Sequence, residues 1–167
     1  MGCAVLHQPP ILFLDEPTSG VDPISRRSFW DLIYGFAEAG TTVFVSTHYM
    51  EEAEFCHRLA VMNRGRLIAL DRPAALKDSI REPILEVRTT DPPRAVEVLS
   101  GVPGIIEVTL FGRALHVMVS DRAAAEKDIT ANLESVGQRI DSIKAIEPSL
   151  EDVFVALVRR SGGTVAG

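Results

Sequence analysis

The stretch from Ile11 to Pro23 constrains the fold of this chain more than any other. Four apolar residues, Ile11 to Leu14, run without polar alternation into two adjacent acids, Asp15 and Glu16. An unbroken apolar run is typical of a strand buried on both faces, as in a parallel sheet covered by helices. The acids then lie at the carboxyl end of the strand, where open α/β sheets bind their ligands. Two acids there can hold Mg²⁺ and orient or deprotonate a water that attacks a phosphate.

A second strand is expected at residues 42–46, and a histidine follows it. Asp22 can cap the intervening helix and Gly40 can end it, so that strand, helix and strand make a right-handed βαβ unit. Because neighbouring parallel strands end at the same edge of a sheet, His48 is expected to share a crevice with the paired acids. Without this context, a histidine at a strand end is more often structural than catalytic.

Two blocks in this half of the chain resemble motifs of the ATP-binding cassette (ABC) ATPases. The end of the Walker B strand and the D-loop of that family are similar to residues 14–23, Leu-Asp-Glu-Pro-Thr-Ser-Gly-Val-Asp-Pro. The family's H-loop is similar to residues 47–53, Thr-His-Tyr-Met-Glu-Glu-Ala. The resemblance covers roughly the first half of the chain. It implies an α/β fold: a truncated P-loop NTPase (ABC cassette) with a mostly parallel sheet. The alternative is a buried strand that ends in two solvated acids.

The resemblance also implies ATP and Mg²⁺ as cofactors of the complete cassette, and a role for each motif residue. Glu16 corresponds to the catalytic glutamate, and Asp15 to the acid that holds Mg²⁺ through water. His48 corresponds to the switch histidine, which contacts the γ-phosphate. The D-loop residues, which lie against a second cassette in a dimer, are Ser19, Gly20 and Asp22.

The phosphate-binding part of such a site is missing from this sequence. No Gly is followed by Lys, and the lysines Lys77, Lys127 and Lys144 all lie downstream of the motifs. A loop whose backbone N–H groups and lysine cradle the phosphates is therefore absent, as are the family's signature motif and Q-loop. We expect the sequence to begin in mid-domain and the chain alone to be inactive. Mg-ATP turnover by the purified chain, abolished by Glu16→Gln, would contradict this.

Three acids, Glu51, Glu52 and Glu54, fall on a short helix after the histidine. Such a group can suggest a metal site, but acids near a helix N-terminus usually form a solvated face, and we interpret them in that way. Two strands that flank the turn Asn63-Arg64-Gly65 predict a hairpin, and Pro73 begins another short helix.

A composition shift near residues 81–83 predicts a domain boundary. Residues 1–80 are expected to be the end of a cassette, 84–160 a small α+β accessory domain, and 161–167 a disordered tail. Alternating strands and two helices in the order β-α-β-β-α-β predict the ferredoxin-like split βαβ pattern, with one packed face. His116 falls on the polar side of its strand, and we assign it no role.

The last expected helix begins with a capping box of Ser149 and Asp152. Pro-Ser-Leu-Glu-Asp-Val-Phe, residues 148–154, resembles the closing motif of an accessory domain that follows the cassette in drug- and antibiotic-export ABC proteins. This resemblance is weaker than the first.

Composition limits the possible partners. A net charge of −6 without a basic cluster argues against a nucleic-acid-binding surface. Cys3 and Cys56 have no metal-ligand spacing, and no apolar run is long enough to cross a bilayer. We expect a cytoplasmic protein, and the resemblance implies a place at the inner face of the cell membrane through a membrane-spanning permease.

The predicted function is that of the ATP-hydrolysing subunit of an ABC exporter, represented here by its Walker B, D-loop and H-loop part. The alternative is a non-catalytic regulatory or dimerisation module with a vestigial cassette remnant.

Overall fold

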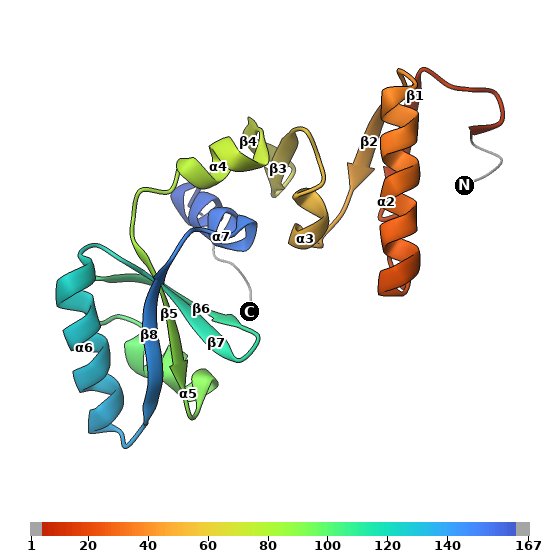
Figure 1. Ribbon diagram of the computed structural model, residues 1–167. Coiled ribbons are helices and arrows are strands. Elements are labelled where there is room, and N and C mark those ends of the chain that lie inside the picture. The colour runs from red at the N-terminus through yellow and green to blue at the C-terminus, as the bar shows by residue number, and fades with distance from the viewer. Residues whose placement is uncertain (1–4, 163–167) are drawn as a thin grey trace. The chain divides into compact units, whose positions relative to one another are not determined.

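The computed structural model describes residues 5–162, which form two compact units, Met1–His57 and Arg58–Gly167 (Figure 1). Cys3 and the predicted tail beyond Gly162 lie outside the described residues. Within residues 5–162, no helix is long and apolar enough to cross a membrane.

The first unit is built on a βαβ unit, as predicted. Strand β1 (Ile11–Asp15) pairs in parallel with β2 (Thr42–Ser46), and α2 (Pro23–Glu38) connects them. The register runs from Ile11 opposite Thr42 to Asp15 opposite Ser46, so both strands end at the same level. A short helix, α3 (Met50–Ala53), follows β2. The unit therefore brings the residues after β1 and after β2 to one edge.

Helix α2 begins with the cap that its sequence predicts. The Asp22 carboxylate caps it by accepting the N–H groups of Ile24 and Ser25, both at 3.0 Å. Trp30 and Ile33 are buried, whereas Leu32 between them is exposed. Two buried residues one turn apart define the face that packs.

The prediction that β1 is buried on both faces is wrong for this structure. Leu12 is buried, but Phe13 is 74% exposed and stacks on Phe44, which is 55% exposed, with ring centroids 5.1 Å apart. Among the described residues, β1 has β2 as its only strand neighbour, and both rings on this face are largely exposed. The apolar run therefore forms the predicted strand without the predicted burial.

The second unit contains the predicted ferredoxin-like pattern. Its antiparallel sheet has the strand order β6-β7-β5-β8. The elements are β5 (Ile84–Thr89), α5 (Pro92–Leu99), β6 (Ile105–Phe111), β7 (Ala114–Val119), α6 (Arg122–Ser135) and β8 (Ile140–Ile146). One face packs against α5 and α6 around Leu85, Leu115, Ile129 and Leu133.

The other face of this sheet is also covered, which corrects the prediction of a single packed face. Three elements supply the cover: the β3–β4 hairpin (Leu59–Asn63 and Arg66–Asp71), α4 (Pro73–Asp78) and α7 (Leu150–Arg160). Their core with the sheet contains Leu76, Ile80, Ile84, Met118, Val153 and Ala156. Every residue of β7 is therefore buried, including those on its supposed polar side.

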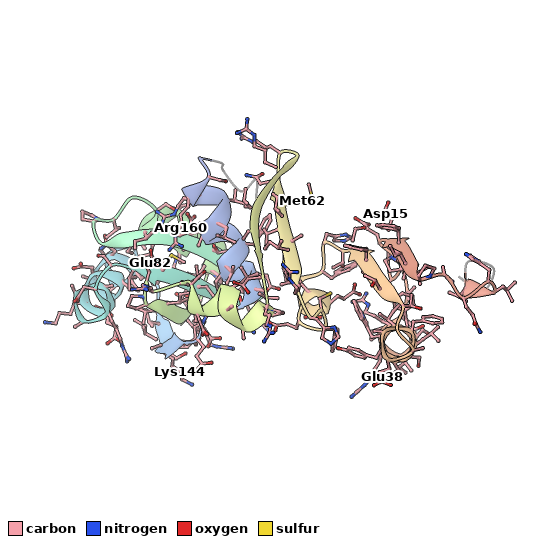
Figure 2. The ribbon with its side chains drawn as sticks, turned by 90° about the horizontal axis from the view of Figure 1, so that it is seen from above. Asp15, Glu38, Met62, Glu82, Lys144 and Arg160 are labelled. Atoms are coloured by element: carbon pink, nitrogen blue, oxygen red, sulfur yellow. The ribbon has the colours of Figure 1, made fainter. Side chains whose placement is uncertain are left out.

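The compact units do not divide where the composition shifts. The hairpin and α4 belong to the second unit because they pack with α7, and the division falls between His57 and Arg58. Arg160 at the end of α7 also donates to Glu82 just before β5, at 3.0 Å (Figure 2). The limits 1–80 and 84–160 remain a prediction from sequence.

Candidate functional site

The candidate site lies at the edge where β1 and β2 end. The Ser46 hydroxyl donates to the Asp15 carboxylate, and Asp15 is labelled at the end of its strand in Figure 2. The Glu16 N–H in turn donates to the hydroxyl oxygen of Ser46 at 3.0 Å and to its carbonyl at 3.1 Å. Ser46 thus holds the backbone of one acid and the side chain of the other.

Glu16 leaves the strand in the left-handed region, with φ +41°. This conformation costs a residue with a side chain on the order of 1–3 kcal/mol, and such residues cluster at functional sites. The Glu16 carboxylate lies 3.1 Å from Nδ1 of His48, and both side chains are about half exposed. The structure therefore brings together the two residues proposed as catalytic. Asp15, predicted to share their crevice, has Ser46 as its partner.

The predicted D-loop residues lie on the turn after Glu16. Ser19 and Gly20 are exposed, and the Ser19 N–H donates to the Glu16 carbonyl at 3.1 Å. Gly20 has φ +72°, which a glycine adopts without strain. The Asp22 carboxylate caps the helix. The hydrogen bond from the Ser25 hydroxyl, and to a smaller extent the one from the Ser25 N–H, lowers the pKa of Asp22. The structure leaves Ser19 and Gly20 open to solvent.

The prediction that Glu51, Glu52 and Glu54 form a solvated face is wrong for Glu52. Glu51 and Glu54 are exposed, but Glu52 is 1% exposed. Its carboxylate accepts the hydroxyls of Thr18 at 2.5 Å and Thr47 at 2.9 Å. Contacts with the loop after β1 and the loop after β2, which helix spacing does not reveal, accompany the burial of this acid.

Two more residues near His48 were missed by the sequence interpretation. Arg26 lies with its Nε 3.3 Å from Glu52 and its guanidinium carbon 4.6 Å from the centre of the Tyr49 ring. The Tyr49 ring in turn packs on the His48 ring, with centroids 4.1 Å apart. For the hydrogen-bonded acids Asp15 and Glu52, the sequence did offer a signal. The hydroxyl residues Thr18, Ser46 and Thr47 lie close to the motif acids, and a hydroxyl can donate to a carboxylate.

The donor set at this edge suits Mg²⁺ as part of a site completed by other groups. Mg²⁺ uses oxygen ligands, and commonly one or two carboxylates together with phosphates and waters. Asp15 and Ser46 supply a carboxylate and a hydroxyl oxygen side by side. Within residues 5–162, no cluster of three or more His, Cys, Asp or Glu side chains could hold a metal by itself.

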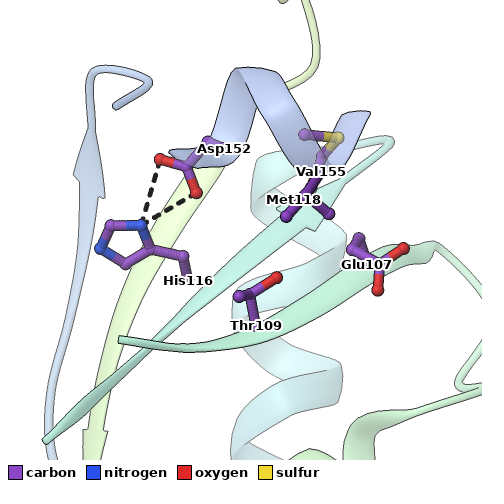
Figure 3. Close-up of a pocket in the computed structure, with 6 residues that line it drawn as sticks. All are labelled: Glu107, Thr109, His116, Met118, Asp152 and Val155. Carbon is purple, nitrogen blue, oxygen red and sulfur yellow. Dashed lines mark hydrogen bonds and ion pairs between the residues drawn. The ribbon is translucent and has the colours of Figure 1, made fainter. Parts of the chain in front are cut away.

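A second polar cluster lies in the second unit and joins β7 to α7. His116 is buried, and its Nδ1 lies 3.0 and 3.1 Å from the two carboxylate oxygens of Asp152 (Figure 3). Phe111 stacks on the His116 ring at 4.2 Å. Asp152 also accepts the Ser149 N–H at 2.8 Å, which completes the predicted capping box. The pocket beside it has a volume of about 10 Å³, which is room for about one water.

Comparison with known proteins decides the family. Residues 72–158 match the family of ATP-binding protein DrrA1-3-like C-terminal domains. The chain belongs to this family. The match begins just after β4 and ends within α7, so it covers α4, the four-stranded sheet, α5, α6 and most of α7.

Relatives of this DrrA1-3-like chain are ATP-binding proteins. It is 36% identical over 94% of its length to the daunorubicin resistance ATP-binding protein DrrA2 of Streptomyces coeruleorubidus, and covers 50% of that protein. It is 34% identical over 94% of its length to the Nod factor export ATP-binding protein I of Rhizobium leguminosarum bv. viciae, and covers 49% of that protein.

A third relative matches a shorter part of the chain. The probable multidrug ABC transporter ATP-binding protein YbhF of Escherichia coli K12 is 54% identical over 77 residues, 46% of this chain and 13% of YbhF. The resemblance to ABC exporter ATP-binding proteins is confirmed. The chain spans about half the length of the first two relatives.

Proposed function

We propose that this chain carries the hydrolytic half of the ATP site in the ATP-binding subunit of an ABC exporter. The observation that supports this most is the contact of Glu16 with His48, 3.1 Å apart, at the paired ends of two parallel strands. The resemblance of residues 14–23 and 47–53 to cassette motifs and the names of the relatives support the same proposal.

Each side chain at the edge has a task in this proposal. Glu16 is the general base, because its half-exposed carboxylate can accept a proton from a water. His48 orients that carboxylate and presents its other ring nitrogen to the γ-phosphate of ATP. Asp15 would hold Mg²⁺ through water, and the ion would offset the charge of the phosphates. Ser19, Gly20 and Asp22 would lie against a second cassette.

The other half of the site, which holds the phosphates, is proposed to come from residues outside this sequence. The three lysines of the chain, at positions 77, 127 and 144, fall in the second unit, and none follows a glycine. We therefore propose that the complete protein binds ATP and Mg²⁺ and works with a permease at the inner face of the membrane. The export direction is supported by the name of the Nod factor export relative.

A chimera tests this proposal. The half of DrrA2 that aligns with this chain would be replaced by the chain, and phosphate release from Mg-ATP would be measured. We expect turnover that Glu16→Gln lowers by about 10²–10⁴-fold, the usual contribution of a general base. Glu51→Gln is the matched control, since Glu51 is an exposed acid near the same edge.

Two outcomes would count against the proposal. A chimera that binds ATP and turns it over equally well with Gln at position 16 would remove Glu16 from the chemistry. A chimera that dimerises and binds ATP without any turnover would favour the regulatory or dimerisation module.

A further inference from the structure

We propose that Glu52 is the positioning residue that holds the Glu16 loop and the His48 loop in register. The catalytic importance of Glu52 rests on the proposed function, whereas the contacts that Glu52 makes do not depend on it. Glu52 lies on α3, and its carboxylate accepts hydrogen bonds from the neighbours of the pair, Thr18 and Thr47.

The two carboxylate oxygens of Glu52 are divided between the two loops. Oε1 accepts the hydroxyl of Thr18 at 2.5 Å, and Thr18 stands two residues after Glu16. Oε2 accepts the hydroxyl of Thr47 at 2.9 Å, and Thr47 immediately precedes His48. Thr18 is buried, with 1% of its surface exposed, like Glu52. One carboxylate therefore joins the residues that follow β1 to the residues that follow β2.

A second route from Glu52 reaches the His48 ring itself. Arg26 Nε lies 3.3 Å from Glu52 Oε1, but its N–H is not aimed at that oxygen, so the contact is an ion pair without a hydrogen bond. The guanidinium lies over the Tyr49 ring, a cation–π contact, and that ring packs on His48. The Thr47 hydroxyl also accepts the Tyr49 N–H at 3.0 Å.

A purely structural role would not require a charge at this place. Burying a carboxylate is costly unless it is paired and hydrogen-bonded, and an apolar residue of similar volume often stabilises a core as well or better. An apolar residue could not fix the separation of the two loops in the same way, because the two carboxylate oxygens each accept a hydroxyl from a different loop. Displacement of a reacting group by about 1 Å can cost about 100-fold in rate.

The test measures the native contact between Glu16 and His48 in the 167-residue chain. An isotope-labelled sample would be examined by NMR for the nuclear Overhauser cross-peak between the His48 ring protons and the side-chain CH₂ protons of Glu16. We expect Glu52→Gln to abolish this cross-peak and Glu51→Gln to retain it. A change in stability alone leaves the native cross-peak in place, so a cross-peak of wild-type strength in Glu52→Gln overturns the proposal.

A second pair of variants decides the question if Glu52→Gln does not fold. Trp30 is the only tryptophan in the sequence, and its side chain is buried in the first unit. Its indole NMR signal therefore reports whether that unit is folded. Thr47→Val removes one hydroxyl at constant shape, and Thr47→Ser keeps it. We expect the cross-peak to weaken with Val and recover with Ser. Equal cross-peaks in the two variants overturn the proposal.

The chimera supplies the catalytic readout. If it hydrolyses ATP, Glu52→Gln is expected to lower kcat by about 100-fold and leave KM nearly unchanged, since no ATP contact is removed. A wild-type kcat would overturn the positioning role. An inactive chimera would instead contradict the proposed function, and the cross-peak would still decide the role of Glu52.

Discussion

His116 Nδ1 lies within 3.1 Å of both carboxylate oxygens of Asp152, and this contact joins the middle of β7 to the first turn of α7. The same carboxylate caps the helix through Ser149. The accessory sheet and its outer helix are thus linked by one buried acid. The carboxylate that completes the helix cap is therefore also the partner of a histidine in the sheet.

Replacing this acid tests the link. We expect Asp152→Asn to lower the free energy of unfolding of the second unit by about 2 kcal/mol near neutral pH, because hydrogen bonds to a charged group are lost. Urea unfolding followed by circular dichroism would measure it. Asp128→Asn, an exposed acid on α6, is the control and should change little.

The pH dependence of stability follows from the same residue. Burial alone would raise the pKa of Asp152, but hydrogen bonds from His116 and then from Ser149 outweigh it and lower the pKa. Since the folded-state pKa lies below the unfolded value of about 3.9, this stabilisation is present above that pH and is lost as the pH falls through the folded-state value. Urea titrations at several acidic pH values should show a steeper loss in wild type than in Asp152→Asn. Parallel pH profiles would contradict this.

The Asp121 cap of α6 gives a third prediction. Its carboxylate accepts the Ala124 N–H at 2.7 Å. We expect Asp121→Ala to cost about 1 kcal/mol in the free energy of unfolding, and Asp121→Asn to cost little, because asparagine caps a helix nearly as well. The same urea experiment measures both variants. An equal loss in both would show that the charge, and not the cap, is what matters.

Cys56 reports on the environment of Glu52. Burial, and then the charge of Glu52, raises the pKa of the Cys56 thiol, so little of it is thiolate near neutral pH. In a Cys3→Ser background, we expect slow reaction with a disulfide reagent, faster reaction after Glu52→Gln and no change after Glu51→Gln. Absorbance of the released thiol would follow the rates.

The exposed face of β1 and β2 predicts self-association. Phe13 and Phe44 stack there in solvent, and exposed apolar strands pair readily with other chains. We expect concentration-dependent sedimentation that the double change Phe13→Thr and Phe44→Thr reduces, since threonine keeps the strand preference. Leu110→Thr, at an exposed position on β6, is the control. A monodisperse wild-type monomer would contradict this.

Much of the fold could be predicted because its signals are local. The capping box at Ser149 depends on a few consecutive residues. So does the hairpin turn, in which Arg64 and Gly65 have positive φ. The meeting of Glu16 and His48 was also predictable, because parallel strands that end together bring their following residues together.

The errors concern residues whose surroundings come from distant parts of the chain. Glu52 is buried by Thr18, Arg26 and Thr47, and no periodicity of α3 indicates those contacts. His116 stands on the polar side of β7, but α7 covers that side and supplies Asp152 as its partner. In both cases, an acid and its partners compensate for burial that the local pattern does not reveal.

The left-handed backbone at Glu16 separates two acids that the sequence places side by side. Asp15 continues the direction of the strand and is held by β2, whereas Glu16 turns out of it toward His48. Glycine or asparagine would adopt this conformation at a lower cost than glutamate. We therefore expect a selection for thermal stability alone to discard the glutamate, and a selection that requires ATP turnover to keep it.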